Sequence, residues 1–393
     1  MAIPGLDDLI ASGLRGKRVL VRADLNVPMA HGSITDDTRL RASLPTLQRL
    51  REAGARVVVT SHLGRPKGDR KAEFSLRPVS KALADLLDAP VAFCEENVGR
   101  KPLEAIAELT EGQIIVLENL RFDPGEEQNA PAFVRSLAEL ADAYVNDAFG
   151  TAHRAHASTA GVARQIPHVA AGDLLTAEIE HLRAVREPAR PLLVVLGGAK
   201  VSDKISVLDA LAPHADTLAI GGAMAYTFLA ARGVAVGNSL IEPTAFEDAK
   251  RVEALAAEAG NKLLLPSDHI IAQEISAESP TRIVEEIPKG WMGVDIGPET
   301  AERYKNEARQ AQTVFWNGPM GIFEIEPFAT GTRSVAQGLA SSNGLTVVGG
   351  GDSLSAINGL GLGDEIDHLS TGGGAALEFV QGLELPGVAE LER

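Results

Sequence analysis

Short runs rich in Val, Ile and Leu alternate with segments of helical periodicity along the whole chain, and this alternation constrains the fold most. The runs begin at Arg18, Ala55, Gln113 and Asp142, and again at Pro191, Asp216, Asn261, Gln312 and Leu345. Several are nearly continuous in apolar residues, which is typical of strands buried on both faces of a parallel sheet. Helical segments such as 40–54 and 245–260 lie between them and end in glycine, as helices often do. The pattern predicts an α/β protein with open, doubly wound sheets that are mainly parallel.

The chain of 393 residues is too long for one hydrophobic core and suits two domains. A charged helical stretch, "LLTAEIEHLRAVREPARP" from Leu174 to Pro191, follows a glycine-rich segment and contains two prolines at its end, before a new strand. We therefore predict an N-terminal domain over 1–173, a connecting helix or hinge over 174–190, and a C-terminal domain over 191–374.

The composition narrows the possible partners and locations. The net charge of −16, with no block of Lys and Arg to offset it, argues against nucleic acid as a bulk partner. Cys94 is the only cysteine, which excludes a disulfide framework and a cysteine-rich zinc site and fits a reducing compartment. The N-terminus lacks the apolar core of a signal peptide, and the longest uncharged stretch is too short to span a membrane. We expect a cytoplasmic protein that contacts neither membrane nor nucleic acid.

Polar residues directly after the first-half runs are the first candidates for a site, because ligands of doubly wound sheets bind beyond the carboxyl ends of the strands. These residues are Arg22, Asp24, Asn26, His62, Arg65, Arg121, His153 and Arg154. Arginine presents a planar fork that suits phosphate and carboxylate, so four arginines at such ends predict one anion pocket. The alternative for any single arginine is a surface ion pair.

The second-half runs end instead in glycine-rich segments: "GGAKVSDK", "GGAM", "WNGPMGIFE" and "GGGDS". Glycine after a strand allows backbone N–H groups to approach a phosphate at the next helix N-terminus, although it also makes ordinary tight turns. Asp352 is a candidate ligand for magnesium beside phosphate oxygens, and Lys200 and Lys204, four residues apart, could face the same phosphates. Neither a P-loop signature nor a dinucleotide-binding fingerprint is present.

Eight motifs of the chain resemble those of the phosphoglycerate kinase family. They are "RADLNVP", "SHLGRPKG", "ENLRF", "NDAFGTAHRAHAS", "LGGAKVSDKI", "DIGPET", "WNGPMGIFE" and "VVGGGDS", in this order between Arg18 and Gly374. The resemblance implies two Rossmann-like domains joined by a hinge, with the C-terminal tail (375–393) packed back on the first domain. It also implies a monomeric phosphotransferase that uses a carboxyl group as acceptor. Such an enzyme moves a phosphoryl group reversibly between 1,3-bisphosphoglycerate and ADP, giving 3-phosphoglycerate and ATP in glycolysis and gluconeogenesis.

Position by position, the resemblance assigns residues to two sites. The N-terminal site for 3-phosphoglycerate comprises Asp24, Asn26, Arg39, His62, Arg65, Arg121, His153 and Arg154. The C-terminal site for ATP or ADP comprises Lys200, Lys204, Gly293, Asn317, Glu324, Gly350, Gly351, Asp352 and Ser353, with Mg²⁺ at Asp352. Within these sets the residues assigned to catalysis are Arg39, Arg154, Lys200 and Gly350. The chain differs from the frequent family residues at Ala23, Leu25 and Ser353, which removes no charge and no phosphate donor.

The cluster "HRAH" at 153–156 allows three interpretations: a metal site, a general base with helpers, or a clamp for an anion. The carboxylate of 3-phosphoglycerate is already ionised near neutral pH, so the transfer needs no base to form the nucleophile. No third His or Cys lies near His153 and His156 in the sequence, and Arg154 would repel a cation. We therefore expect Arg154 to clamp the anion, His153 to contact substrate or brace the loop, and His156 to make structural hydrogen bonds.

Two other classes of function share part of this pattern. A nicotinamide-dependent dehydrogenase would need the dinucleotide fingerprint that the chain lacks. A two-lobed anion-binding protein would share the architecture and the arginine pocket, but it would normally have an export signal and would not consume ATP. The ordered motifs favour the kinase over both alternatives.

Overall fold

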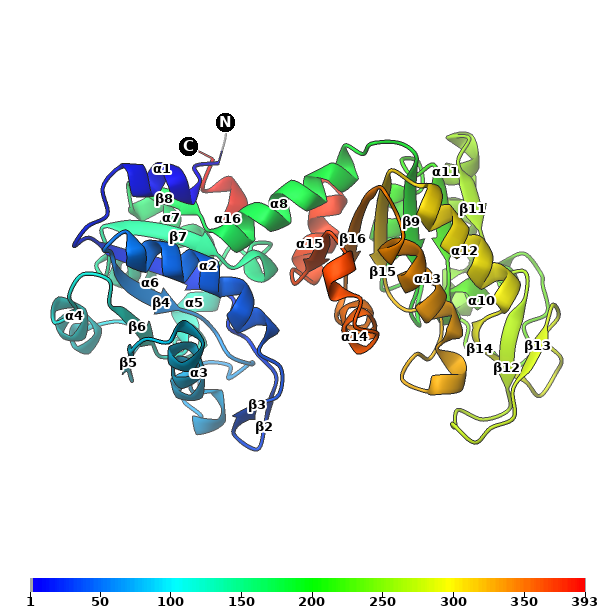
Figure 1. The fold of residues 1–393 in the computed structure, drawn as a ribbon, viewed down its shortest axis with the longest axis horizontal. Coiled ribbons are helices and arrows are strands. Elements are labelled where there is room, and N and C mark those ends of the chain that lie inside the picture. Colours follow the sequence, from blue (N-terminus) through cyan, green and yellow to red (C-terminus); the bar gives the residue numbers. More distant parts are fainter. Residues whose placement is uncertain (1–2, 393) are drawn as a thin grey trace. The chain divides into compact units, whose positions relative to one another are not determined.

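The computed structural model describes residues 3–392, which form two compact units. Unit 1 comprises residues 3–179 and 384–392, and unit 2 comprises residues 180–383. The division falls within the helix α8 (Asp173–Arg186), so its first half belongs to unit 1 and its second half to unit 2 (Figure 1). Each unit contains a six-stranded sheet whose neighbouring strands are all parallel, which confirms the predicted α/β fold class.

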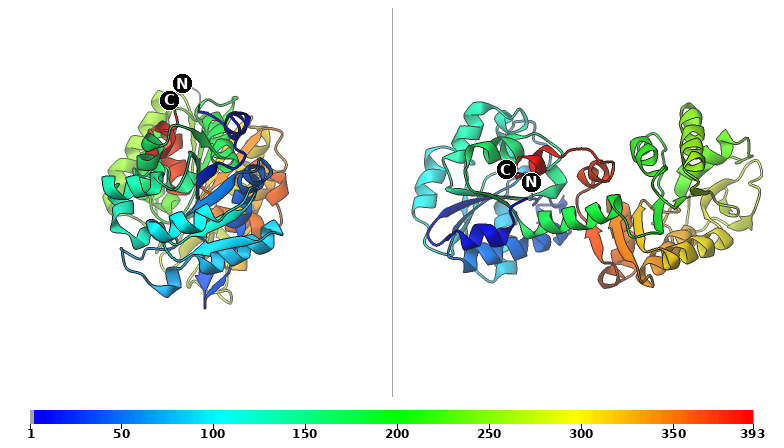
Figure 2. Two further views of the ribbon diagram at one scale, coloured as in Figure 1. Left: turned by 90° about the vertical axis from the view of Figure 1, so that its left-hand side faces the viewer. Right: turned by 90° about the horizontal axis from the view of Figure 1, so that it is seen from above.

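The sheet of unit 1 has the order β5-β6-β4-β1-β7-β8. Its strands are β1 (Arg18–Ala23), β4 (Arg56–Thr60), β5 (Val91–Cys94), β6 (Ile114–Leu117), β7 (Ala143–Asp147) and β8 (Val169–Ala171). The central strand β1 is buried from Val19 to its end, because helices cover both faces of the sheet (Figure 2). Val19 and Val21 pack in one core with Leu47 of the helix α2 (Thr38–Glu52), and the period of two along a strand directs Leu20 to the opposite face.

The helices of unit 1 connect these strands, and a small two-stranded ribbon precedes α2. The remaining helices are α1 (Leu6–Ala11), α3 (Arg77–Leu87), α4 (Arg100–Ala107), α5 (Pro124–Glu127), α6 (Pro131–Ala138), α7 (Val162–Gln165) and α16 (Pro386–Ala389). The ribbon consists of β2 (Met29–Ala30) and β3 (Ser33–Ile34). Two short segments bear on the site: the 3₁₀ turn η2 (Leu120–Phe122) and the π-helical turn η4 (Ala157–Gly161). Two further 3₁₀ turns are η1 (Ala72–Phe74) and η3 (Phe149–Thr151).

The last helix, α16, attaches to the segment that follows β7. The side-chain amide of Asn146 donates to the carbonyl of Gly387 at 2.9 Å, and the N–H of Gly387 donates to the carbonyl of Ala152 at 2.8 Å. Residues 384–392 therefore belong to unit 1, although 204 residues of unit 2 precede them, counted as 383 − 180 + 1.

The main sheet of unit 2 has the order β11-β10-β9-β15-β16-β17. Its strands are β9 (Leu192–Leu196), β10 (Thr217–Ile220), β11 (Lys262–Leu264), β15 (Thr313–Asn317), β16 (Leu345–Gly349) and β17 (His368–Ser370). The neighbouring central strands β9 and β15 are buried along their whole length. Trp316 is fully buried, and its indole N–H donates to the carbonyl of Gly318 at 2.7 Å, which fixes the turn after β15.

A second, antiparallel sheet of order β13-β12-β14 extends unit 2 and was not predicted from the sequence. Its strands are β12 (His269–Ala272), β13 (Arg282–Val284) and β14 (Met292–Ile296). The helices of unit 2 are α9 (Ile205–Leu211), α10 (Gly222–Ala231), α11 (Phe246–Glu258), α12 (Pro298–Gln310), α13 (Thr330–Ala340), α14 (Gly351–Gly359) and α15 (Gly374–Val380). Its 3₁₀ turns are η5 (Pro243–Ala245), η6 (Glu326–Phe328) and η7 (Gly363–Glu365). None of the helices in residues 3–392 combines the length and the apolar character that crossing a membrane requires.

Candidate active site

The carboxyl ends of four strands meet at one edge of the unit 1 sheet, because β1 lies between β4 and β7, and β6 adjoins β4. The polar residues predicted from the sequence follow these ends within a few positions. Asp24 and Asn26 follow β1, His62 follows β4, Arg121 follows β6, and Arg154 lies in the loop after β7. Parallel pairing thus gathers side chains that are up to 130 residues apart, counted as 154 − 24.

Arg39 lies in the first turn of α2 and is oriented by Asp24. Its Nη1 donates to both carboxylate oxygens of Asp24, at 3.0 and 2.9 Å. The side chain of Asp24 is 3% exposed, whereas that of Arg39 is 33% exposed. The buried carboxylate therefore holds one side of the guanidinium and leaves the rest of it accessible.

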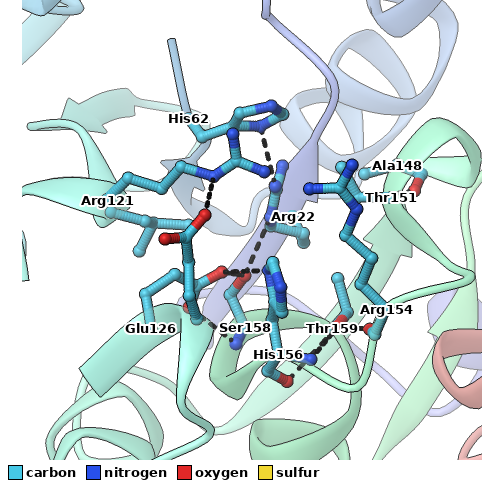
Figure 3. A network of polar contacts seen from close by, with 12 residues as sticks. Arg22, His62, Arg121, Glu126, Ala148, Thr151, Arg154, His156, Ser158 and Thr159 are labelled. Carbon is cyan, nitrogen blue, oxygen red and sulfur yellow. Dashed lines mark hydrogen bonds and ion pairs between the residues drawn. The ribbon is translucent and has the colours of Figure 1, made fainter. Parts of the chain in front are cut away.

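His62 is buried and neutral beside Arg22, a fully buried arginine of β1. Nη2 of Arg22 lies 3.1 Å from Nδ1 of His62 (Figure 3). Burial is the main cause that holds the pKa of His62 well below its usual range, and four positive charges add to it: Arg22, Arg121, Arg39 and Arg154. The imidazole therefore remains uncharged at neutral pH.

Arg121 and Asn26 both fix the loop that follows β4. Nη1 of Arg121 donates to the carbonyl of Gly64 at 2.9 Å, and the N–H of Gly64 donates to Oδ1 of Asn26 at 2.8 Å. Gly64 has a φ of +63°, and a Cβ there would come within 2.4 Å of the Phe74 ring, so the position requires glycine. Arg65, the next residue, is exposed.

Arg121 is itself buried, and Glu127 of α5 is its ion-pair partner. The distance from Nε of Arg121 to Oε1 of Glu127 is 3.3 Å. Desolvation lowers the pKa of Arg121 from its very high usual value, which leaves the guanidinium charged. The carboxylate therefore stabilises a cation that burial would otherwise disfavour.

The "HRAH" segment presents Arg154 and holds its two histidines in different ways. Nε of Arg154 donates to Nε2 of His153 at 3.2 Å. Burial, with help from neighbouring positive charges, lowers the pKa of His156 to about 4, and Nδ1 of His156 lies 3.8 Å from Oε1 of Glu126. Among residues 3–392 no group of three His, Cys, Asp or Glu side chains is arranged to hold a metal ion. The anion-clamp assignment of Arg154 stays a prediction.

Two residues of this network, Glu126 and Ser158, were not among the predicted site residues. Arg22 was a candidate by the strand-end rule, although the resemblance did not assign it to the site. Glu126 belongs to α5 rather than to a strand end, and Ser158, in the π-helical turn η4, ends a recognised motif without having been given a role. Ser158 donates to Glu126 through its backbone N–H at 3.0 Å and through its hydroxyl at 2.6 Å.

In unit 2, Lys204 links the ends of two neighbouring strands. Its Nζ donates to the carbonyl of Gly197 after β9 at 2.7 Å, and to the carbonyl and Oδ1 of Asn317 in β15 at 2.7 and 2.6 Å. Burial lowers the pKa of Lys204 to about 8, while the negative charges of Asp352 and Asp203 oppose that shift. Lys200, by contrast, is exposed.

The start of α14 presents backbone N–H groups at the end of β16. Gly350 has a φ of +93°, and a Cβ there would come within 2.9 Å of Nδ2 of Asn317. Ser353 is fully buried, and its hydroxyl accepts the N–H of Gly318 at 2.7 Å. Gly351 and Asp352 are exposed in the first turn. This helix N-terminus therefore has the chemistry of an anion site with one carboxylate beside it.

A cavity of about 280 Å³ adjoins this helix terminus. Two of its lining residues pack closely: a Cβ at Gly293 would come within 2.1 Å of the Tyr226 side chain, so this contact requires glycine. The predicted residues in its lining are Gly293, Glu324 and Asp352. Gly222 of the segment "GGAM" also lines it, and the lining residues that the sequence did not indicate include Tyr226, Leu240, Ile275 and Met292. A lining that is mainly apolar, with the polar side chains of Tyr226, Glu324 and Asp352 among it, suits a partly polar group.

The parallel sheets, the arginine-rich edge of unit 1 and the glycine-rich edge of unit 2 define the class of a two-unit α/β kinase. The family model for phosphoglycerate kinase matches residues 6–383. The chain therefore belongs to the phosphoglycerate kinase family.

Individual relatives agree with this assignment. The chain is 53% identical over 381 residues to a phosphoglycerate kinase from Moorella thermoacetica, which covers 96% of this chain and 97% of that protein. It is 52% identical over 380 residues to one from Herpetosiphon aurantiacus, covering 96% of each. The solved structure of phosphoglycerate kinase from Coxiella burnetii has a TM-score of 0.90 and 41% identity, covering 100% of this chain and 99% of that one. The structure from Pyrococcus horikoshii has a TM-score of 0.85 and 34% identity, covering 99% and 98%.

The predicted enzyme class is confirmed, and the dehydrogenase and the anion-binding protein are set aside. The chain is a phosphotransferase of glycolysis that transfers a phosphoryl group reversibly between 1,3-bisphosphoglycerate and ADP, and ATP and ADP are its nucleotide substrates.

Proposed function

We propose that the arginine-rich edge of unit 1 binds 3-phosphoglycerate and its acyl phosphate form. The supporting observation is the concentration of positive charge: Arg22, Arg39, Arg121 and Arg154 all raise the electrostatic potential at the buried His62. Asp24 and Glu127 pair directly with two of these arginines, and the excess positive charge suits a ligand with several negative charges. Asn26, His62, Arg65 and His153 complete the set of groups that we assign to this substrate.

Arg39 and Arg154 are the catalytic arginines in this proposal. The carboxylate nucleophile of 3-phosphoglycerate is ionised at neutral pH, so the protein has to align it and neutralise charge on the phosphoryl oxygens. Asp24 fixes the direction of the Arg39 guanidinium before any ligand arrives. A preorganised cation loses little entropy when the transition state forms.

The glycine-rich edge of unit 2 binds the nucleotide. Its base occupies the cavity lined by Tyr226 and Gly293, with Glu324 at the same cavity for the sugar. The phosphates meet the N-terminus of α14, where the backbone N–H groups of Gly350, Gly351, Asp352 and Ser353 begin the helix. Lys204 and Asn317 hold the turns around this position, and the exposed Lys200 is free to follow the transferred phosphoryl group.

Asp352 fits the requirements of a magnesium ion that arrives with the nucleotide. Magnesium prefers one or two carboxylates together with phosphate oxygens and water, and Asp352 is an exposed carboxylate beside the base cavity and the helix terminus. When bound, the ion neutralises phosphate charge and orients the phosphates. Asp352 holds it, while Lys200 and the N–H of Gly350 act on the phosphoryl oxygens directly.

The two ligands belong to different units, so transfer requires them to meet, and we propose that α8 acts as the hinge between domains 1–173 and 191–374. We further propose that the protein acts as a monomer in the cytoplasm. Each site is assembled from residues of one chain, and a single buried cysteine suits a reducing compartment.

Crossed variants test this division of the sites. We expect Arg121→Gln to raise the KM for 3-phosphoglycerate and leave that for ATP unchanged, and Lys204→Met to do the reverse. The KM values are measured in steady-state assays that couple ATP consumption to the presence of 3-phosphoglycerate, with Arg100→Gln as an exposed-arginine control. A rise in the ATP KM alone for Arg121→Gln would contradict the assignment.

A further inference from the structure

Four buried side chains form one continuous hydrogen-bonded chain beneath the arginine-rich edge of unit 1 (Figure 3). The hydroxyl of Ser158 donates to Oε1 of Glu126 at 2.6 Å and accepts from Nε of Arg22 at 2.9 Å. Nη2 of the same Arg22 lies 3.1 Å from Nδ1 of His62. Exposure is 1% for Glu126, Ser158 and Arg22, and 4% for His62, so water does not compete for these bonds.

The direction of every bond in this chain follows from what each group can donate. A guanidinium has only donors, so Nδ1 of His62 has to accept from Arg22. The proton of the neutral imidazole therefore resides on Nε2. A serine hydroxyl has one proton, which goes to Glu126, and its lone pair receives Arg22. Because Arg22 can only donate, its bonds to Ser158 and His62 cannot run in the opposite direction.

Glu126 compensates the charge of Arg22 through Ser158 rather than by direct contact. Among residues 3–392 Arg22 forms no ion pair, and its third contact is the carbonyl of Ala23. Burial raises the pKa of Glu126, while the positive charge of Arg22 and the two bonds from Ser158 oppose that rise. The carboxyl group of Glu126 accepts both the N–H and the hydroxyl of Ser158. The serine therefore transmits the field of a buried carboxylate to a buried guanidinium.

We propose that Ser158 and Glu126 are positioning residues for the phosphoglycerate site. They fix Arg22, and Arg22 fixes His62 as the Nε2–H tautomer, so that His62 offers the anion a neutral, preoriented donor. This inference rests on the proposed function of unit 1. It assigns no contact with substrate to Ser158 or Glu126.

The tautomer of His62 is measured directly by ¹⁵N NMR of the imidazole rings in the full chain, with the His62 signals assigned from a His62→Gln variant. In the unaltered protein we expect Nδ1 without a proton and Nε2 with one. A proton on Nδ1, or a charged ring at neutral pH, would overturn the inference. The tautomer itself is read in the unaltered protein, and the His62→Gln variant serves only to assign the signals.

Ser158→Ala then breaks the chain between Glu126 and Arg22. We expect signals of both His62 tautomers and a Kd for 3-phosphoglycerate that rises roughly tenfold, the scale of one hydrogen bond to a charged group. The Kd for ADP should not change. An unchanged tautomer and an unchanged Kd for 3-phosphoglycerate would contradict the inference.

Tyr144→Phe is the matched control, because the Tyr144 hydroxyl donates to the backbone carbonyl of Ser158 at 2.7 Å and is equally buried. It disturbs the same turn without touching the chain of four side chains, so we expect lower stability with the tautomer and the Kd unchanged. A similar loss of affinity in Tyr144→Phe would reduce Ser158 to a structural role. If 3-phosphoglycerate leaves the His62 signals of the unaltered protein unmoved, the proposed site itself fails, whichever tautomer is present.

Discussion

Unit 1 and unit 2 have the same kind of parallel sheet, yet they build their candidate sites from different materials. At the edge of unit 1 the ligand-facing groups are long side chains, and acids orient them: the buried Asp24 pairs with Arg39, and the exposed Glu127 pairs with Arg121. At the edge of unit 2 they are backbone N–H groups and small residues, and Lys204 serves to tie the strand ends together. The comparison teaches that a side-chain site is altered by changing charge, whereas a backbone site is altered by adding a single carbon.

The largest effect on activity is expected from substitution of Arg39, because this side chain of the unit 1 site acts on the transition state. We expect Arg39→Ala to lower kcat by roughly 10³- to 10⁵-fold, the range known for arginines that stabilise a phosphoryl group in transfer. The Kd for 3-phosphoglycerate should change far less, because the interaction forms fully only in the transition state. Steady-state kinetics with calorimetric titration measures both quantities.

Two variants of the same helix serve as controls for Arg39. Arg39→Lys keeps a partner for the buried Asp24 but loses the fork, so it should restore activity only in part. Arg41→Ala removes an exposed arginine that pairs with Asp37, and it should leave kcat unchanged. A normal kcat in Arg39→Ala would remove this residue from catalysis.

The second largest effect is expected at the backbone site of unit 2, where Gly350→Ala adds one methyl group. Gly350 has a φ of +93°, and its new Cβ would lie 2.9 Å from Nδ2 of Asn317, so Gly350→Ala has to displace the first N–H groups of α14. We expect kcat/KM for ATP to fall roughly 10- to 100-fold, which corresponds to a backbone strain of about 1–3 kcal/mol. The KM for 3-phosphoglycerate should stay the same.

Gly359→Ala at the other end of α14 is the matched control, because its φ is not positive and no atom lies within 4 Å of its Cβ position. We expect normal kinetics and a small gain in stability from that variant. If Gly350→Ala behaved like Gly359→Ala, the backbone of α14 would have no part in phosphate binding.

The sequence predicts the two sites to different degrees. The nine apolar runs correspond to β1, β4, β6, β7, β9, β10, β11, β15 and β16, because strands buried on both faces need continuous apolar residues. Three edge strands escape detection: β5 and β17, in each of which only one residue is buried, and β8, which is buried but has only three residues. The antiparallel sheet of unit 2 escapes detection as well. Edge strands need not be apolar, so the pattern is weak there.

Within the sites, the residues at strand ends could be predicted from position alone. Arg39 follows no strand, and only the family resemblance assigned it. Glu126 and Tyr226 could not be found, because their roles depend on how a helix packs against a distant turn or strand. Side chains that act through packing leave no periodic signal in the sequence.

The smallest effect is expected on the pH dependence of folding stability, which depends on a feature that the two units share: a buried aspartate at a strand end. Asp147 in unit 1 and Asp295 in unit 2 are buried at strand ends and accept backbone N–H groups, and burial raises the pKa of each to about 7. Between the usual carboxyl pKa of 3.8 and about 7, the unfolded chain ionises while the folded chain keeps its proton. The stability contributed by Asp147 should therefore fall as the pH rises through this window, by at most about 1.4 kcal/mol per pH unit.

Asp147→Asn removes this titration and keeps an acceptor for the N–H of Leu174. We expect the variant to gain stability relative to the unaltered protein as the pH rises from 5 to 7, measured by urea unfolding. Asp142→Asn is the contrasting control, because Arg18 lowers the pKa of Asp142 below its usual 3.8, so its loss should destabilise the protein by the same amount throughout the range from pH 5 to 7. A difference for Asp147→Asn that does not vary with pH would contradict a buried, protonated Asp147.

The most direct test of the division between the sites is hydrogen exchange measured by mass spectrometry with one ligand at a time. With 3-phosphoglycerate alone, we predict slower exchange in segments 22–39, 61–65, 119–127 and 148–158, and no change in unit 2. With ADP and magnesium, we predict slower exchange in segments 197–204, 317–324 and 349–353, and none in unit 1. Protection of segment 349–353 by 3-phosphoglycerate alone, or of segment 119–127 by ADP alone, would contradict the account.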